Sequence, residues 1–260
     1  MNATVGCRLR LDVYAPTDLV LSVATAVEPA SESLVISGVE VRELPGDTRL
    51  HVARLPVGSH EIAYDAQLTL APGTREVDEL DALIALRPSR YCPSDQLAAL
   101  AVRELGPVDA GTVERAVAWV RERLVYDPSG SRPVDSAVDT LLTGRGVCRD
   151  YAHLLVTVLR GLDIPARVVS AYAPGLSPMD FHAVVEVAVD GMWQIHDATG
   201  MAPRQSLVRI ATGRDAADTA FMTLSGGSAY PTSTEVWAWT DGDLPLDGPL
   251  APAGVIHRLA

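Results

Sequence analysis

Three residues of this sequence have the types and the order that nucleophilic catalysis requires, namely Cys148, His182 and Asp197. In such a set a thiolate attacks a carbonyl carbon, a histidine transfers the proton, and a carboxylate orients the histidine ring. The chemistry that the three could perform together is acyl transfer from an amide through a thioester. Whether their side chains lie close together depends on the helices and strands in which the three residues are found.

Cys148 is expected in the first turn of a helix. The glycine-rich turn Gly144–Gly146 precedes it, and apolar residues then recur at helical spacing until Gly161. The free N–H groups and the dipole of a helix N-terminus favour an anion. They should therefore favour the thiolate over the thiol and raise its reactivity. The alternative is a small buried structural residue, a common role for a free cysteine.

The base and its orienting carboxylate are expected on a β-hairpin. Two β-rich runs flank Asp190-Gly191, a strong signal for a two-residue turn. With that turn Asp197 faces Val184, and His182 lies two residues from Val184 on the same face of the sheet. His182 and Asp197 are then diagonal neighbours within reach of each other. His196 points to the opposite face, which makes it a poor base.

The chain resembles the transglutaminase-like superfamily in four segments, GVCRDYAHLL, GLDIPARVVSAY, FHAVVEV and WQIHDATG. The resemblance covers roughly residues 90 to 225. It implies a papain-like core with Cys148 as nucleophile, His182 as base and Asp197 as its orienter. It also implies a bacterial protein in which a β-rich domain precedes the core.

Two positions depart from the usual pattern of that family. Val184 stands where many members have Trp, and Ala198 stands where many have Pro between Asp and Thr. Both departures occur in bacterial subgroups of the family. The two departures therefore affect which substrate is expected, and they leave the expected triad unchanged.

A polar loop that begins at Tyr126 precedes the nucleophile segment, and in the family such a loop lies beside the nucleophile. An oxyanion hole needs about two donors. The backbone N–H of Cys148 is one candidate and the Tyr126 hydroxyl is another, although Tyr126 could equally form an amphipathic wall of the site. His153 lies about 140° around the helix from Cys148 and is expected to pack or to form hydrogen bonds.

Composition excludes several other classes of function. The net charge of −12 argues against nucleic acid and against anionic membranes as partners. The apolar run Leu19–Val27 is too short to span a bilayer. An odd and sparse set of three cysteines favours a reducing, cytoplasmic location without disulfides. With no CxxC pair, HExxH motif or phosphate-binding glycine loop, no cofactor and no metal are expected.

The N-terminal part of the chain is expected to be an antiparallel β-domain. Residues 4–14 alternate apolar and polar side chains, which places Cys7 in the core. Further strand-like runs are separated by Pro and Gly; they are Leu19–Val27, Leu34–Leu44, Arg49–Leu55 and His60–Leu70. Short strands at this spacing predict a sandwich or a barrel.

Helical patterning begins near Ser94 and again near Thr112, so the whole chain is expected to be α+β. We expect a β-sandwich-like domain over residues 1–86, a transglutaminase-like catalytic core over residues 87–240, and an extended tail over residues 241–260. Arg209–Leu224 is expected to form a strand followed by a turn at Gly213–Asp215, whose two charges are more consistent with structure than with substrate contact.

The function expected from these features is that of a cysteine enzyme acting on a peptide or another amide. Water would resolve the thioester in a peptidase or amidase, and an amine would resolve it in a transglutaminase. Hydrolysis is favoured because nothing in the sequence marks an amine site. The alternative is a binding module that keeps the transglutaminase-like core without turnover.

Overall fold

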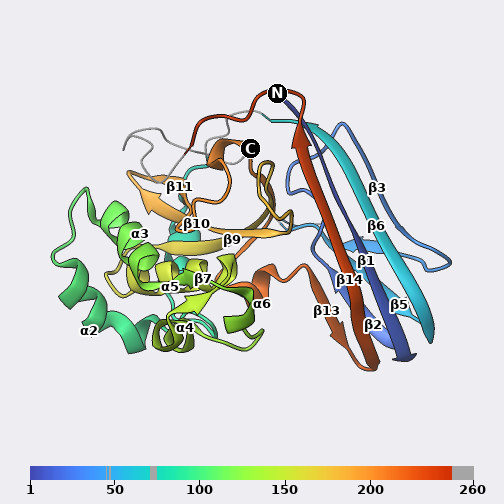
Figure 1. Ribbon diagram of the computed structural model, residues 1–260, viewed down its shortest axis with the longest axis horizontal. Helices are drawn as coiled ribbons and strands as arrows, with labels where there is room; N and C mark the ends of the chain where they lie inside the picture. The colour runs from blue at the N-terminus through green and yellow to red at the C-terminus, as the bar shows by residue number, and fades with distance from the viewer. Residues whose placement is uncertain (45, 47, 71–74, 248–260) are drawn as a thin grey trace.

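The computed structural model describes residues 1–44, 46, 48–70 and 75–247. Its fold is α+β, as expected: helices gather at one side of the molecule and long antiparallel strands at the other (Figure 1). The shorter strands of a third sheet lie between them, over the helix that begins at Cys148. The expected arrangement of a helix-borne cysteine on an antiparallel sheet is therefore confirmed.

The strands of the N-terminal part are β1 (Asn2–Ala15), β2 (Thr17–Leu21), β3 (Ser31–Ile36), β4 (Arg42–Leu44), β5 (Leu50–Leu55) and β6 (Gly58–Thr69). The helices that follow are α1 (Glu79–Ala85), α2 (Ser94–Leu105), α3 (Thr112–Arg123), α4 (Ala137–Thr143) and α5 (Cys148–Arg160), with a 3-10 turn over Pro128–Gly130. Between α3 and α5 lie two short strands, β7 (Val125–Tyr126) and β8 (Arg145–Gly146).

The remaining elements are β9 (Ala166–Tyr172), β10 (His182–Val189), β11 (Met192–His196), β12 (Val208–Gly213), α6 (Ala216–Thr219), β13 (Met222–Ser225) and β14 (Ser228–Thr240), with a 3-10 turn over Arg204–Ser206. Three four-stranded sheets result, with strand orders β14-β1-β6-β3, β13-β2-β5-β4 and β11-β10-β9-β12. Strands β7 and β8 pair in parallel on their own.

The β-sandwich is built as the alternation in β1 predicts. Ala3, Val5, Cys7, Leu9, Leu11 and Val13 are all buried, and residues of β2, β5 and β6 join them in one apolar cluster. Tyr172 and Ile210 of the third sheet belong to the same cluster. The sandwich and the sheet of the helical part therefore share a hydrophobic core.

The expected division of the chain at residues 86 and 240 needs a correction. β14 pairs along nearly the whole of β1, from Ala3 opposite Thr240 to Ala15 opposite Ser228. β13 pairs with β2. The last strands therefore complete the two sheets of the N-terminal sandwich and do not belong to the core. The sequence around β14 does not show that β14 pairs with β1, because the residues next to a strand in the sequence do not determine which distant strand it pairs with.

The described residues of the connector between β6 and α1, which begin at Arg75, are attached to the third sheet. Glu76 forms a bridge with Met192, and the backbone of Arg75 and Val77 bonds to the β10–β11 hairpin. Helix α1 follows, with Asp78 as its N-cap. The connector thus extends the third sheet before the chain enters the helical part.

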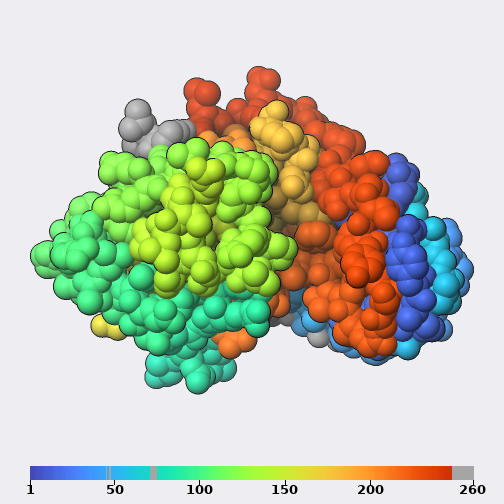
Figure 2. Space-filling model, turned by 60° about the horizontal axis from the view of Figure 1, so that its bottom comes forward, coloured from blue at the N-terminus to red at the C-terminus, as the bar shows by residue number. Residues whose placement is uncertain are grey.

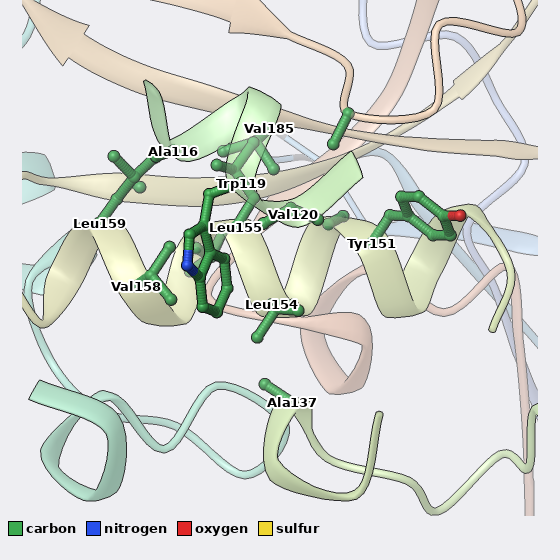
Figure 3. Packing of buried hydrophobic residues seen from close by; sticks show 14 of the residues in the cluster. Ala116, Trp119, Val120, Ala137, Tyr151, Leu154, Leu155, Val158, Leu159 and Val185 are labelled. Carbon is green, nitrogen blue, oxygen red and sulfur yellow. The ribbon is translucent and has the colours of Figure 1, made fainter. Parts of the chain in front are cut away.

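Helix α5 is the centre of the helical part. Ten of its residues between Tyr151 and Arg160 are buried without interruption. Figure 3 shows Leu155, Val158 and Leu159 packed against Trp119 and its neighbours on α3, with Val185 of β10 beside them. Since a helix that is buried all round is held by contacts on every side, the position of its first residue is fixed by the core.

The expected extended tail is tied down over its first residues. Arg204 donates three hydrogen bonds to the Asp247 carboxylate at 2.7 to 2.8 Å, two from its guanidinium and one from its backbone N–H. The Asp247 side chain is 3% exposed. Residues 248–260 lie outside the described part of the chain.

Candidate active site

Cys148 is the first residue of α5, and the turn before it explains why the helix begins there. Gly144 ends α4 with a positive φ of 66°, and Val147 is extended. The Asp150 carboxylate accepts the Val147 N–H at 2.9 Å, which caps the first turn. A Cβ on Gly146 would lie 2.6 Å from the Asp150 Cβ, so only glycine fits between the turn and the cap.

Arg149 fixes the polar loop that faces this turn. Its Nη2 atom donates to the Ser131 hydroxyl at 2.7 Å and to the Arg132 carbonyl at 3.0 Å. Arg132 in turn pairs with the buried Asp135 carboxylate. The loop between β7 and α4 is therefore attached to the nucleophile helix one residue after Cys148.

The hairpin that carries the other two residues has the expected register. Asp190 and Gly191 both take positive φ, as a two-residue hairpin turn requires, and Val185 pairs with His196. Asp197 follows directly after β11. His182 Nε2 lies 2.8 Å from Asp197 Oδ2, and both side chains are almost completely buried.

The Asp197 carboxylate is held by further donors that the sequence did not single out. Thr199 donates to Asp197 Oδ1 twice, from its backbone N–H and from its hydroxyl, each at 2.7 Å. Arg121 of α3 donates to the carbonyl oxygens of Asp197 and Ala198 at 3.2 and 3.0 Å. These contacts leave Oδ2 for His182 and fix the end of β11 against the helices.

The thiol and the imidazole are brought together by β10. Cys148 Sγ lies 4.0 Å from the carbonyl oxygen of Phe181, the residue before His182. His182 Nε2 is occupied by Asp197, and the buried Nδ1 has no nitrogen or oxygen partner among the described residues. Nδ1 is therefore the ring nitrogen left for the thiol.

Electrostatics at the pair favour a charged histidine. Burial opposes the imidazolium, but the charge and hydrogen bond of Asp197, together with the hydrogen bond and charge of Cys148, raise the pKa of His182 to about 10. Burial also acts to raise the pKa of Asp197, and the His182 charge and its hydrogen bonds outweigh it and lower that pKa. Asp197 thus remains a carboxylate and stabilises His182 as the imidazolium at neutral pH.

The structure places Tyr126 beside Cys148. Tyr126 pairs with Gly146, two residues before the nucleophile, in the parallel β7–β8 pair. Its side chain is 40% exposed. Burial and the charges of Cys148, Asp180 and Asp197 raise the pKa of Tyr126 to about 12, and a hydrogen bond from the Cys148 backbone N–H acts in the opposite direction. The phenol is therefore a neutral hydroxyl at neutral pH.

The other titratable residues near α5 have structural roles. His153 stacks on Tyr91 with 5.3 Å between ring centroids and accepts the Ala216 N–H at 3.1 Å, as its expected role in packing and hydrogen bonding requires. Burial lowers its pKa to about 3. Asp215 is buried, caps α6 and accepts the Tyr91 N–H, so this carboxylate belongs to the fold. Among the described residues no group of His, Cys, Asp and Glu could hold a metal ion.

A buried charged cluster on β9, β10 and β12 is separate from the thiol. Arg167 donates to Glu186 and to Asp81 at 2.7 Å each, and its guanidinium lies 3.8 Å from the centre of the Trp193 ring. Arg209 also pairs with Glu186. The adjoining cavity of about 520 Å³ is lined by residues of this cluster, of α6 and of the sandwich, and by neither Cys148 nor His182.

Sequence reasoning missed Thr199, Arg121 and the Arg167 cluster. Thr199 had a local signal, because an Asp side chain often accepts the backbone N–H two residues further along the chain. Arg121 had none, since it reaches the carbonyl of a residue that lies 77 positions away.

Comparison with known proteins identifies the family and the fold of this chain. Residues 98–198 match the model of the transglutaminase-like superfamily. A crystal structure of a "Putative Cysteine Protease" from Cytophaga hutchinsonii is 30% identical to this chain and superposes with a TM-score of 0.87, over 96% of this chain and 95% of that one.

Two further similar proteins are more distant. An uncharacterized protein of Mycobacterium leprae is 28% identical over 158 residues, which are 55% of this chain and 54% of that protein, so the match spans about half of the curated relative. The periplasmic domain of TgpA from Pseudomonas aeruginosa is 20% identical with a TM-score of 0.43, over 76% of this chain and 90% of that domain.

Proposed function

We propose that this chain, which belongs to the transglutaminase-like superfamily, is a cysteine enzyme that breaks an amide bond of a peptide substrate. Cys148 is the nucleophile, His182 the acid and base, and Asp197 the group that orients His182. The observation that carries the proposal is the 2.8 Å contact between His182 Nε2 and Asp197, which leaves Nδ1 on the side of the Cys148 thiol.

The first half of the reaction transfers the acyl group to sulfur. His182 is protonated at neutral pH, and the reactive form of the pair is this imidazolium beside the Cys148 thiolate, which is the nucleophile. The Cys148 thiolate adds to the amide carbonyl, and the negative charge moves to the carbonyl oxygen. When the intermediate collapses, the C–N bond breaks and His182 gives its proton to the leaving amine, which yields a thioester and a neutral imidazole.

The second half releases the acyl group. Water enters where the amine left, neutral His182 takes its proton, and the hydroxide adds to the thioester carbonyl. The C–S bond then breaks, which regenerates the thiolate and the imidazolium and releases a carboxylic acid. An amine in place of water would give a new amide, the transglutaminase outcome.

Donors for the developing oxyanion come from the start of α5 and from Tyr126. The Cys148 backbone N–H has no intrahelical acceptor, because it belongs to the first turn. The neutral Tyr126 hydroxyl can turn its proton towards the same oxygen. This use requires Tyr126 to release the Cys148 N–H when the substrate carbonyl enters.

We favour hydrolysis over amine transfer. Of the relatives, the Cytophaga hutchinsonii protein bears the words "Cysteine Protease", and it matches this chain over nearly its whole length. We also propose a cytoplasmic bacterial protein, since Cys7, Cys92 and Cys148 are all free thiols. In the described part of the chain no helix is long and apolar enough to cross a bilayer.

A peptide library tests the proposal. The protein is incubated with the library in the presence and absence of a fluorescent primary amine, and mass spectrometry follows new termini, deamidated side chains and incorporated amine. Hydrolysis predicts new termini or deamidated side chains and no incorporated amine. Cys148→Ala and His182→Ala should each abolish turnover, whereas Asp197→Ala should reduce it less, because Asp197 makes and breaks no bond. A wild-type protein that binds peptides and leaves all of them unchanged would favour the binding-module alternative.

A further inference from the structure

An acidic side chain stands directly beside the proposed catalytic pair. Asp180 lies two residues before His182, at the end of the loop that joins β9 to β10. Figure 2 shows this loop, drawn in gold, at the surface where the green helical part meets the orange-red C-terminal strands. Asp180 is exposed on it, so its carboxylate is open to a ligand.

The carboxylate is held in place without a cationic partner. Its Oδ1 accepts the Phe181 N–H at 2.7 Å, which fixes its direction relative to the backbone that leads into β10. No Arg of the described residues forms an ion pair with it. Other Asp side chains of the helical part, such as Asp109 and Asp127, have hydrogen bonds or ion pairs that employ them in turns.

The backbone places Asp180 next to the proposed site, since Phe181 and His182 follow it directly. Partial burial raises the pKa of Asp180, and the Phe181 N–H and the His182 charge act against that rise. Asp180 is also one of the charges that, after burial and the charge of Cys148, raise the pKa of Tyr126. The Asp180 charge therefore acts on both His182 and Tyr126. Cys148 Sγ itself lies 4.0 Å from the carbonyl of Phe181, the next residue.

We propose that Asp180 determines specificity by binding a positively charged group of the substrate next to the amide that Cys148 attacks. The chemical class is a peptide with an ammonium or guanidinium group flanking the reacting bond. This inference rests on the proposed function for its substrate. It requires that Asp180 makes the electrostatic potential at the thiol more negative, and this potential can be measured without any substrate.

Thiol reagents of opposite charge provide that measurement. Cys148 is labelled with methanethiosulfonates that carry a trimethylammonium group, a sulfonate group or a neutral methyl group, and the rates are read by peptide mapping. Cys7 and Cys92 are buried and serve as internal references. The quantity compared is the ratio of the cationic to the anionic rate, because a general change in thiol reactivity cancels in it.

Removing the charge should lower that ratio about five- to tenfold, the effect of one unit charge a few ångströms from the reagent in partly aqueous surroundings. The variant is Asp180→Asn, and Asp180→Glu should keep the ratio. Asp163→Asn is the matched control, because Asp163 lies beyond the C-terminal end of α5 and takes a positive φ that Asn tolerates.

A ratio that Asp180→Asn leaves unchanged, or that Asp163→Asn lowers equally, overturns the inference. Failure of the proposed function has a different signature. In that case all three reagents would label Cys148 slowly in the wild type, while the ratio would still respond to Asp180. If Asp180→Asn misfolds, the reagents will label its Cys7 and Cys92. The Asp180→Glu variant then decides the outcome: a retained ratio of cationic to anionic rates supports the proposal, and a lost ratio refutes it.

Discussion

Thr199 donates two hydrogen bonds to the same oxygen of Asp197, one from its backbone N–H and one from its hydroxyl, both at 2.7 Å. The other oxygen of that carboxylate faces His182. Thr199 therefore decides which oxygen of Asp197 is available to the base. It positions the Asp197 carboxylate, and through it the His182 ring, of the proposed triad.

Thr199→Val should reduce Cys148 alkylation at pH 7 by about three- to tenfold. The change removes one hydrogen bond to a charged group, which typically contributes about 1.5–3 kcal/mol, and part of that loss should appear as a less well oriented His182. Thr199→Ser keeps the hydroxyl and should restore the rate. Equal rates for the Val and Ser variants, whatever their value, would show that the hydroxyl does not act through Asp197.

The His182–Asp197 pair should make stability depend on pH in a specific direction. The pKa of His182 is raised from 6.5 to about 10 by folding. Its protonation therefore stabilises the folded state fully below about pH 6.5, and this contribution is lost as the pH rises through about 10. We expect the difference in melting temperature between the wild type and Asp197→Asn to be larger at pH 7 than at pH 10. A difference that is constant or grows over this range contradicts the assignment of the charge to His182.

The close approach of Gly146 to Asp150 predicts a local steric limit. A Cβ at position 146 would lie 2.7 Å from Asp150 Oδ2, so Gly146→Ala must displace the cap of α5. We expect a loss of about 1–3 kcal/mol in the free energy of unfolding, the usual cost of overpacking, together with slower labelling of Cys148. Gly242→Ala is the control, because nothing lies within 4 Å of its Cβ. Urea denaturation of both variants checks the prediction, which fails if they are equally stable.

The clamp between Arg204 and Asp247 predicts a tethered C-terminal segment. Asp247→Asn removes the charge that binds the Arg204 guanidinium, and we expect a loss of about 1–2 kcal/mol, since the arginine side chain is partly exposed to solvent. Amide hydrogen exchange at residues 204–207 should increase several-fold. Asp243→Asn, an exposed carboxylate nearby, should leave the exchange unchanged. Protection that survives in the Asp247 variant would mean that other contacts hold the segment.

Local patterns were enough to predict the register of the β10–β11 hairpin and the start of α5. The turn at Asp190-Gly191 sets the register of β10 and β11, and a register set by two residues also places His182 and Asp197 on one face. Helical spacing after Gly146 predicts the start of α5 at Cys148. Both features depend on residues close together in the sequence, because local backbone preferences determine a hairpin turn and a helix start.

What the sequence did not predict depends on contacts between distant residues. β14 pairs with β1 across more than two hundred positions, and its alternation resembles that of any half-exposed strand. Arg121 and Arg204 bind a backbone carbonyl and a tail carboxylate that no periodic pattern marks. For this reason the core expected over residues 87–240 includes β13 and β14, although these strands complete sheets that begin at the N-terminus.

The central claim is that His182 activates the Cys148 thiol, and the most direct measurement is the alkylation rate of Cys148 at pH 7 in the wild type and in His182→Gln. A neutral reagent such as iodoacetamide is used, and intact-mass spectrometry and peptide mapping give the rate at each cysteine. Since the thiolate is the reacting species, we expect Cys148 to react at least about tenfold more slowly once the imidazolium is absent. Cys7 and Cys92 should stay unlabelled in both proteins. Equal rates at Cys148 in the two proteins would contradict the account.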